Sequence, residues 1–153
     1  MFVSTINILY ISIEGNTRSF VNKLQEYAKS LHDMDESAPN INLKEVSEQT
    51  DFDNEQSNYF AFVPTYLDGG NGIDNGVKEL MTNALGEYID YGNNARHCLG
   101  VIGSGNRNFN EQYCLTAKRY AKKFNTPFLA DYELRGTGAD VERIYKLLVA
   151  TAK

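Results

Sequence analysis

The chain has 153 residues, a length that fits one domain and can bury a core without disulfides or metals. Its net charge of −5 argues against nucleic-acid binding, which requires basic patches to meet phosphates, and against binding to anionic membrane surfaces. The first residues lack the basic and apolar regions of a secretory leader, so we expect a cytoplasmic protein.

Apolar runs that alternate with helical patterns predict an α/β fold. The first run, Ile6–Ile11, is almost continuously apolar, as expected for a central parallel strand, and apolar residues at helical spacing follow over Thr17–Leu31. Alternating residues over Ile41–Val46 predict an edge strand, and Tyr59–Val63 predicts a second central strand. Helical spacing then marks the segment from Ile73 to Ala84.

The second half of the chain continues this alternation. A third central strand is predicted at Cys98–Ile102, and a helix follows with its inner face between Tyr113 and Phe124. The last strand, Pro127–Tyr132, begins with a proline, which favours a sheet edge, and a final helix has its inner face between Val141 and Leu148. The acidic, amide-rich stretch Ser47–Asn58 is predicted to be a loop, either solvated or facing a partner.

Five strands joined by right-handed crossovers predict a doubly wound parallel sheet with helices on both faces. The length suits the flavodoxin-like strand order 2-1-3-4-5, as one domain over residues 1–153. Ligands of such sheets bind outside the carboxyl ends of the strands, at the switch point between the first and third strands.

Three polar segments that contain glycine each follow a predicted central strand, so we expect all three at one edge of the sheet. The first, S-I-E-G-N-T over Ser12–Thr17, opens the first helix, where free backbone N–H groups and the helix dipole favour a phosphate. It lacks the glycine–lysine pair of a Walker loop. The alternative is that Asn16 or Thr17 only caps the helix.

The other two segments suit a flat aromatic ligand. Glycines in P-T-Y-L-D-G-G-N-G, Pro64–Gly72, let the backbone approach such a ligand, and Tyr66 offers a ring for stacking. Asparagines in G-S-G-N-R-N-F-N, Gly103–Asn110, can bond to the edge of a pyrimidine-like ring. The alternatives are a flexible turn and a polar crossover loop. Together the three segments match the phosphate, ribityl chain and isoalloxazine of FMN.

The sequence offers no cluster of metal ligands and no pairing of a nucleophile with a base. Cys98 and Cys114 form no C-x-x-C pair, and His32 and His97 lie far apart in the sequence. We therefore expect the chemistry to come from one non-covalently bound FMN per chain.

Residues 101–113, V-I-G-S-G-N-R-N-F-N-E-Q-Y, resemble the signature of the ribonucleotide reductase-associated flavodoxins, the NrdI family. The segment P-F-L-A-D-Y-E-L-R-G-T-G-A-D-V-E, residues 127–142, and the S-x-x-G-N-T start fit the same family, so the resemblance covers nearly the whole chain. It implies an FMN protein that acts beside the metal-binding small subunit of class Ib ribonucleotide reductase. Reduced flavin would react with dioxygen to supply superoxide, which drives tyrosyl-radical formation at a dimanganese site in that subunit.

The resemblance also implies which residues bind FMN. The first segment should hold the phosphate through Ser12, Glu14, Gly15, Asn16 and Thr17. The second should line one side of the ring with Thr65, Tyr66, Asp68, Gly69 and Gly70. The third should line the other side with Ser104, Gly105, Asn106, Asn108 and Phe109. Tyr113 and the segment from Glu133 to Thr137 should lie close by.

Other functions stay open at this point. One is a general flavodoxin-type electron carrier that links an electron-donating reductase to several acceptors; another is a small FMN-dependent quinone or azo reductase. Ordinary flavodoxins usually carry more acid around the flavin, so Arg107 in the third segment favours the function linked to ribonucleotide reductase. A quinone or azo reductase needs an additional pocket for its organic substrate, and this chain is too short to form one without dimerising. A non-catalytic binding module is the remaining alternative, and a yellow purified protein would exclude it.

Overall fold

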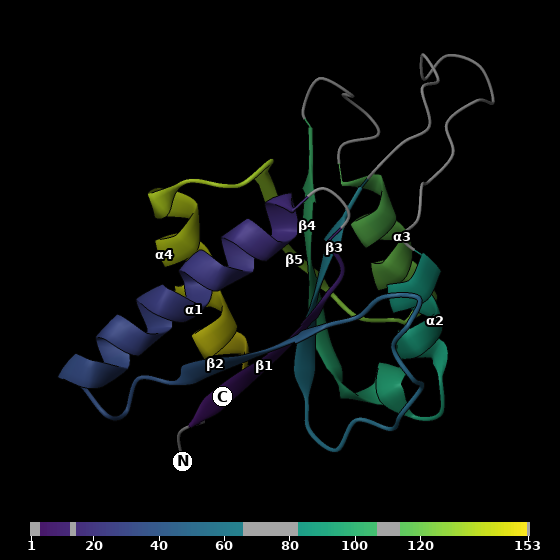
Figure 1. Ribbon diagram of the computed structural model, residues 1–153, viewed down its shortest axis with the longest axis horizontal. Helices are drawn as coiled ribbons and strands as arrows, with labels where there is room; N and C mark the ends of the chain where they lie inside the picture. Colours follow the sequence, from purple (N-terminus) through teal and green to yellow (C-terminus); the bar gives the residue numbers. More distant parts are fainter. Residues whose placement is uncertain (1–3, 13–14, 66–82, 107–113, 153) are drawn as a thin grey trace.

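The structure is a computed structural model, which describes residues 4–12, 15–65, 83–106 and 114–152. Its sheet is parallel, with strand order β2-β1-β3-β4-β5, and this confirms the order predicted from the sequence (Figure 1). The strands are β1 (Thr5–Tyr10), β2 (Asn40–Glu45), β3 (Tyr59–Pro64), β4 (Cys98–Gly105) and β5 (Phe128–Glu133). Because all neighbouring strands are parallel, their carboxyl ends meet at one edge of the sheet.

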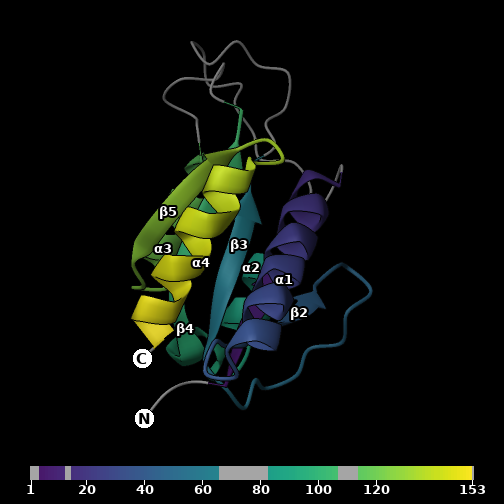
Figure 2. The same ribbon diagram turned by 90° about the vertical axis from the view of Figure 1, so that its left-hand side faces the viewer.

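Helices cover both faces of the sheet. One layer contains α1 and α4, which lie side by side, and the other contains α2 and α3 (Figures 1 and 2). The bounds are α1 (Asn16–Met34), α2 (Asn83–Asp90), α3 (Leu115–Lys123) and α4 (Gly138–Ala152), and a short 3₁₀ helix, η1 (Asn94–His97), precedes β4. No helix in the described ranges has the length and apolar character that a membrane span requires.

Two buried clusters hold the layers together, because alternate side chains of a strand point to opposite faces. In β1, Ile8 belongs to the cluster under α1 and α4, whereas Leu9 belongs to the cluster under α2 and α3. The fully buried ring of Phe20 in α1 stacks on Tyr132 of β5, with ring centroids 3.8 Å apart. This stack fixes the first turns of α1 against the last strand.

The end of β4 differs from the sequence prediction. The strand was expected to end at Ile102, but it continues to Gly105, so the first three residues of the predicted third loop lie inside the sheet. They pair with β5, and Gly103 and Ser104 also pair with β3. Glycine has little intrinsic preference for strands, which explains the error. Its use here is close packing: an added Cβ at Gly103 would lie 2.8 Å from Ala117 Cβ of α3.

Two further points concern helices. The helix predicted from Ile73 to Ala84 lies mostly outside the described residues. In the described part of the chain, α2 extends from Asn83 to Asp90, beyond the end of that prediction. Its buried side chains, Leu85, Tyr88 and Ile89, follow helical spacing. The short helix η1, which ends at His97 directly before β4, was not predicted from the sequence.

The predictions for the sheet edges and for the acidic loop agree with the structure. Strands β2 and β5 are the two edges of the sheet, as predicted. Pro127 lies just before β5, and its carbonyl accepts the Val101 N–H at 2.9 Å. Because proline lacks a backbone N–H, a position at the start of an edge strand removes no hydrogen bond from the sheet. The segment Ser47–Asn58 contains no helix or strand and is mostly exposed. It is nevertheless tied to α2, because the Tyr88 hydroxyl donates to Glu55 Oε2 at 2.6 Å.

We predict that Gly103→Ala lowers the free energy of unfolding by about 1–3 kcal/mol, because the new methyl group overpacks the contact between β4 and α3. Urea denaturation followed by circular dichroism measures the change. Gly138→Ala is the matched control: an added Cβ there meets no atom within 4 Å, and alanine favours the first turn of α4. Equal stability of the two variants would contradict the role given to Gly103.

Candidate functional site

The start of α1 is built around a glycine. Gly15 precedes the helix with φ of 91°, a left-handed conformation that side chains rarely adopt, and it provides no side-chain cap. The hydroxyl of Ser12 instead accepts the Arg18 N–H at 3.3 Å. Neither Asn16 nor Thr17 is the N-cap, so the capping alternative from the sequence analysis is not supported. The first turn of α1 also contains no acidic residue.

Thr17 carries the strongest sign of a ligand at this helix start. Its side chain is fully buried, yet its Oγ1 has no hydrogen-bond partner among the described residues. A buried hydroxyl left unpaired costs on the order of 1–3 kcal/mol, so such groups are uncommon in native proteins unless a ligand or water satisfies them. The hydroxyl lies in the turn whose backbone N–H groups and dipole attract an anion. This donor set fits a phosphate group.

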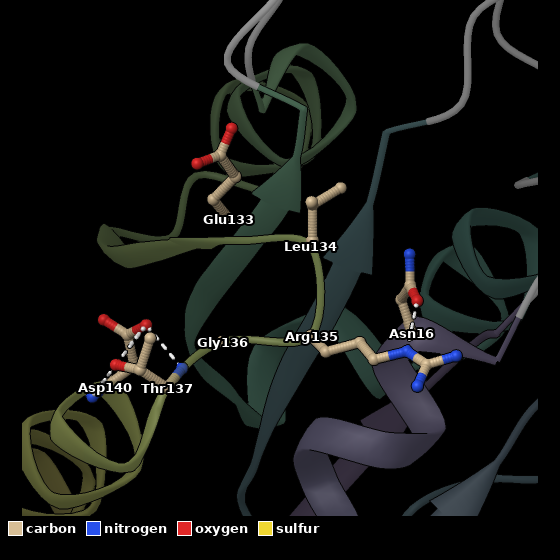
Figure 3. Close-up of a pocket in the computed structure, with 7 residues that line it drawn as sticks. All are labelled: Asn16, Glu133, Leu134, Arg135, Gly136, Thr137 and Asp140. Carbon is tan, nitrogen blue, oxygen red and sulfur yellow. Dashed lines mark hydrogen bonds between the residues drawn. The ribbon is translucent and has the colours of Figure 1, made fainter.

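The loop between β5 and α4 faces the same helix start. Residues Glu133–Thr137 together with Asn16 and Asp140 line a cavity of about 580 Å³ (Figure 3). Arg135 reaches across it, and its Nε donates to Asn16 Oδ1 at 3.1 Å. The structure therefore brings the segment Glu133–Thr137 next to the predicted phosphate loop, although the two are far apart in sequence.

Two acidic residues, Glu133 and Asp140, line this cavity, and Asp140 is engaged in capping α4. Asp140 Oδ2 accepts the Thr137 N–H at 2.8 Å, and the Thr137 hydroxyl accepts the Asp140 N–H at 3.2 Å, an arrangement of the capping-box type. Arg143 also donates to Asp140 Oδ1 at 2.8 Å. Partial burial would raise the pKa of Asp140, but the hydrogen bonds from Arg143 and Thr137 hold it below its usual value. The negative charge of Asp140 is therefore balanced within α4.

A second arginine near the helix start, Arg18, is paired with a carboxylate. Arg18 forms a two-point ion pair with Glu45 at the end of β2, with Nη2–Oε2 and Nε–Oε1 distances of 2.6 and 2.9 Å. The hydrogen bond from Arg18 lowers the pKa of Glu45, against a smaller effect of burial. Tyr10 also donates its hydroxyl to Glu45 Oε1 at 3.0 Å. The charge of Arg18 is thus neutralised by this carboxylate.

The ends of β3 and β4 place several other predicted residues together. The Thr65 N–H donates to the Ser104 carbonyl at 2.9 Å, and Thr65 Oγ1 accepts the Thr116 N–H at 3.0 Å, which ties the start of α3 to β3. Ser104 is buried, whereas Gly105 and Asn106 are half-buried at the carboxyl edge. Among the described residues, no three His, Cys, Asp or Glu side chains are grouped as metal ligands.

The rest of the predicted FMN site cannot be placed relative to these residues. Glu14, Tyr66, Asp68, Gly69, Gly70, Asn108, Phe109 and Tyr113 lie outside the described residues, as does Arg107. Their roles stay predictions. The residue that the sequence analysis did not single out is Arg135. Its signal is a basic residue in a short glycine-containing turn directly after the last strand, at the edge where all the strands end.

We predict that Thr17→Val has opposite effects on stability and on ligand binding. The flavin-free variant should gain about 1 kcal/mol in free energy of unfolding, because an unsatisfied buried hydroxyl is replaced by a methyl group. Its affinity for FMN should fall about tenfold or more, because a hydrogen bond to a charged group is lost. Urea denaturation and titration with FMN measure the two effects.

Thr126→Val is the control, because Thr126 Oγ1 already donates to the Cys98 carbonyl at 3.0 Å, just before β5. This variant should lose about 1 kcal/mol of stability and bind FMN normally. A Thr17→Val protein that is both less stable and unchanged in FMN affinity would contradict a ligand role for Thr17.

Comparisons with known proteins agree with this architecture. A family model described as NrdI flavodoxin-like matches residues 8–146. The chain is 50% identical over 148 residues to an NrdI-like protein of Streptococcus pyogenes serotype M18, and this match covers 97% of this chain and 95% of that protein. It is 30% identical over 141 residues to protein NrdI of Mycoplasma genitalium, covering 92% and 80% of the two chains.

The fold is also similar to that of a solved short-chain flavodoxin associated with a bacterial microcompartment. The TM-score is 0.67 at 18% identity, and the match covers 98% of this chain and 99% of the other. At this identity the likeness concerns the fold alone. The family model and the sequence relatives together show that the chain belongs to the NrdI family of flavodoxin-like proteins.

Proposed function

We propose that the protein binds one FMN non-covalently, with the phosphate at the first turn of α1. Membership of the NrdI family and the flavodoxin-like fold imply a flavin cofactor. The observation that carries the phosphate assignment is the buried hydroxyl of Thr17, which has no acceptor among the described residues. A single phosphate-binding turn favours FMN over FAD, because the sequence offers no second site for an adenosine half.

The chain's own residues would bind and orient this cofactor. The backbone N–H groups of Asn16 and Thr17 and the Thr17 hydroxyl would hold the phosphate, and the positive φ of Gly15 lets the backbone turn around it. Thr65, Ser104, Gly105 and Asn106 end the two central strands next to this turn, so their backbone groups would face the ribityl chain and ring. The bond from Thr116 to Thr65 would keep this edge rigid.

We further propose that the protein serves the small subunit of class Ib ribonucleotide reductase. The NrdI family is associated with ribonucleotide reductase, which supports this assignment over a general electron carrier. When bound and reduced by a donor reductase, FMN would supply electrons to dioxygen, and the resulting superoxide would serve assembly of the dimanganese–tyrosyl radical cofactor. The role of this chain would be to hold the flavin at the carboxyl edge of the sheet and to present it to dioxygen and the partner.

The test combines the anaerobically reduced holoprotein, the manganese-loaded small subunit and dioxygen. We expect the electron paramagnetic resonance signal of a tyrosyl radical, and FMN rather than FAD in the acid extract of the purified protein. The same mixture without the flavoprotein is the control and should give no radical.

The possible failures have different meanings. Superoxide without a tyrosyl radical would favour a general flavodoxin-type carrier. Oxidation without superoxide would contradict the oxygen chemistry but leave the FMN site standing. An acid extract with FAD alone, or no flavin after reconstitution, would contradict the cofactor itself.

A further inference from the structure

We propose that Arg135, in the loop between β5 and α4, is a phosphate-binding residue of this chain. Its guanidinium group would help to neutralise the FMN phosphate at the start of α1. The inference rests on the proposed FMN site and adds to it a charged residue from an element that follows the last strand.

The position of Arg135 is the first argument. Its Nε donates to Asn16 Oδ1 at 3.1 Å, and Asn16 is the first residue of α1. Figure 3 shows the side chain extended from its loop towards the start of the helix, with Asn16 at its end. The guanidinium group therefore lies at the helix end whose backbone N–H groups attract anions.

The second argument is the charge of Arg135. Among the described residues, Arg18 and Arg143 also lie near this edge, and they pair with Glu45 and Asp140 at 2.6 and 2.8 Å. In the described ranges no carboxylate pairs with Arg135, whose contact at the helix start is the neutral amide of Asn16. A cation beside the positive end of a helix dipole is unfavourable on its own. An anion between them would turn both charges into favourable interactions.

The third argument is that the loop is held in place before any ligand binds. The Leu134 N–H donates to the Gly105 carbonyl at 3.0 Å, and the Gly136 N–H donates to the Glu133 carbonyl at 2.9 Å. Gly136 has φ of 69°, and an added Cβ there would lie 2.5 Å from Phe20 Cδ1 of α1. Because the turn is packed directly on α1, phosphate binding would not incur the entropy cost of ordering this loop.

The chemistry of the three groups is complementary to a phosphate. The helix start supplies backbone N–H donors, Thr17 supplies a buried hydroxyl donor that lacks an acceptor, and Arg135 supplies a planar set of charged donors. Arginine suits this position better than lysine, since its fork of N–H groups can contact two phosphate oxygens at once.

The test separates the phosphate from the rest of the flavin. Flavin-free protein is titrated with FMN and with riboflavin, which lacks the phosphate, and binding is followed by quenching of flavin fluorescence. For Arg135→Gln we expect the Kd for FMN to rise about tenfold while the Kd for riboflavin stays unchanged. Arg135→Lys should keep the charge but lose the two-point contact, and should give an intermediate Kd for FMN.

Lys146→Gln is the matched control. It removes one positive charge from the exposed face of α4, where Lys146 contacts Glu142 of the same helix at 3.3 Å. We expect it to change neither Kd, which shows that a general loss of charge is not the cause. The urea midpoint of each variant checks that the fold is intact.

Each other result overturns the inference in a recognisable way. If Arg135→Gln leaves FMN binding unchanged, or weakens FMN and riboflavin equally, Arg135 does not bind the phosphate. If the wild-type protein binds FMN no more tightly than riboflavin, the proposed phosphate site at α1 is itself wrong, and the role of Arg135 fails with it.

Discussion

The stack of Phe20 on Tyr132 is the contact on which the arrangement of the site depends. The two ring centroids lie 3.8 Å apart, and Phe20 also packs against Phe62 of β3, at 6.2 Å between centroids. This aromatic group joins the first turns of α1 to the central and last strands. Because Gly136 lies directly against the same ring, the stack also determines the distance between the helix start and the loop that follows β5.

The distance between the start of α1 and the β5–α4 loop determines which polar groups face one another at this edge. The helix start and the β5–α4 loop both present donors. Two nearby carboxylates, those of Glu45 and Asp140, are each paired with an arginine other than Arg135, and Glu133 also lines the cavity. What the described part of the edge lacks is an acceptor for the Thr17 hydroxyl. A phosphate would supply that acceptor, and this would connect the packing of α1 to the flavin cofactor that the NrdI family implies.

Most of the sheet could be predicted from sequence, because continuous apolar runs such as Ile6–Ile11 identify strands that are buried on both faces. The extension of β4 through Gly103 could not, since its glycine is selected by contact with Ala117 in α3 and not by strand preference. The glycine and hydroxyl residues of the first segment identified the start of α1 as a candidate phosphate site, which stays a prediction. The bond between Asn16 and Arg135 was not, because it joins residues 119 positions apart.

The most direct test of the central claim is to follow the backbone amides of Asn16 and Thr17 by nuclear magnetic resonance while flavin is added to ¹⁵N-labelled protein. If the start of α1 binds the phosphate, FMN should shift both amide protons downfield, as expected for hydrogen bonds to a charged oxygen, and riboflavin should not. The account would be contradicted if FMN binds, as judged by its fluorescence, while both amides keep the positions they have in the flavin-free protein.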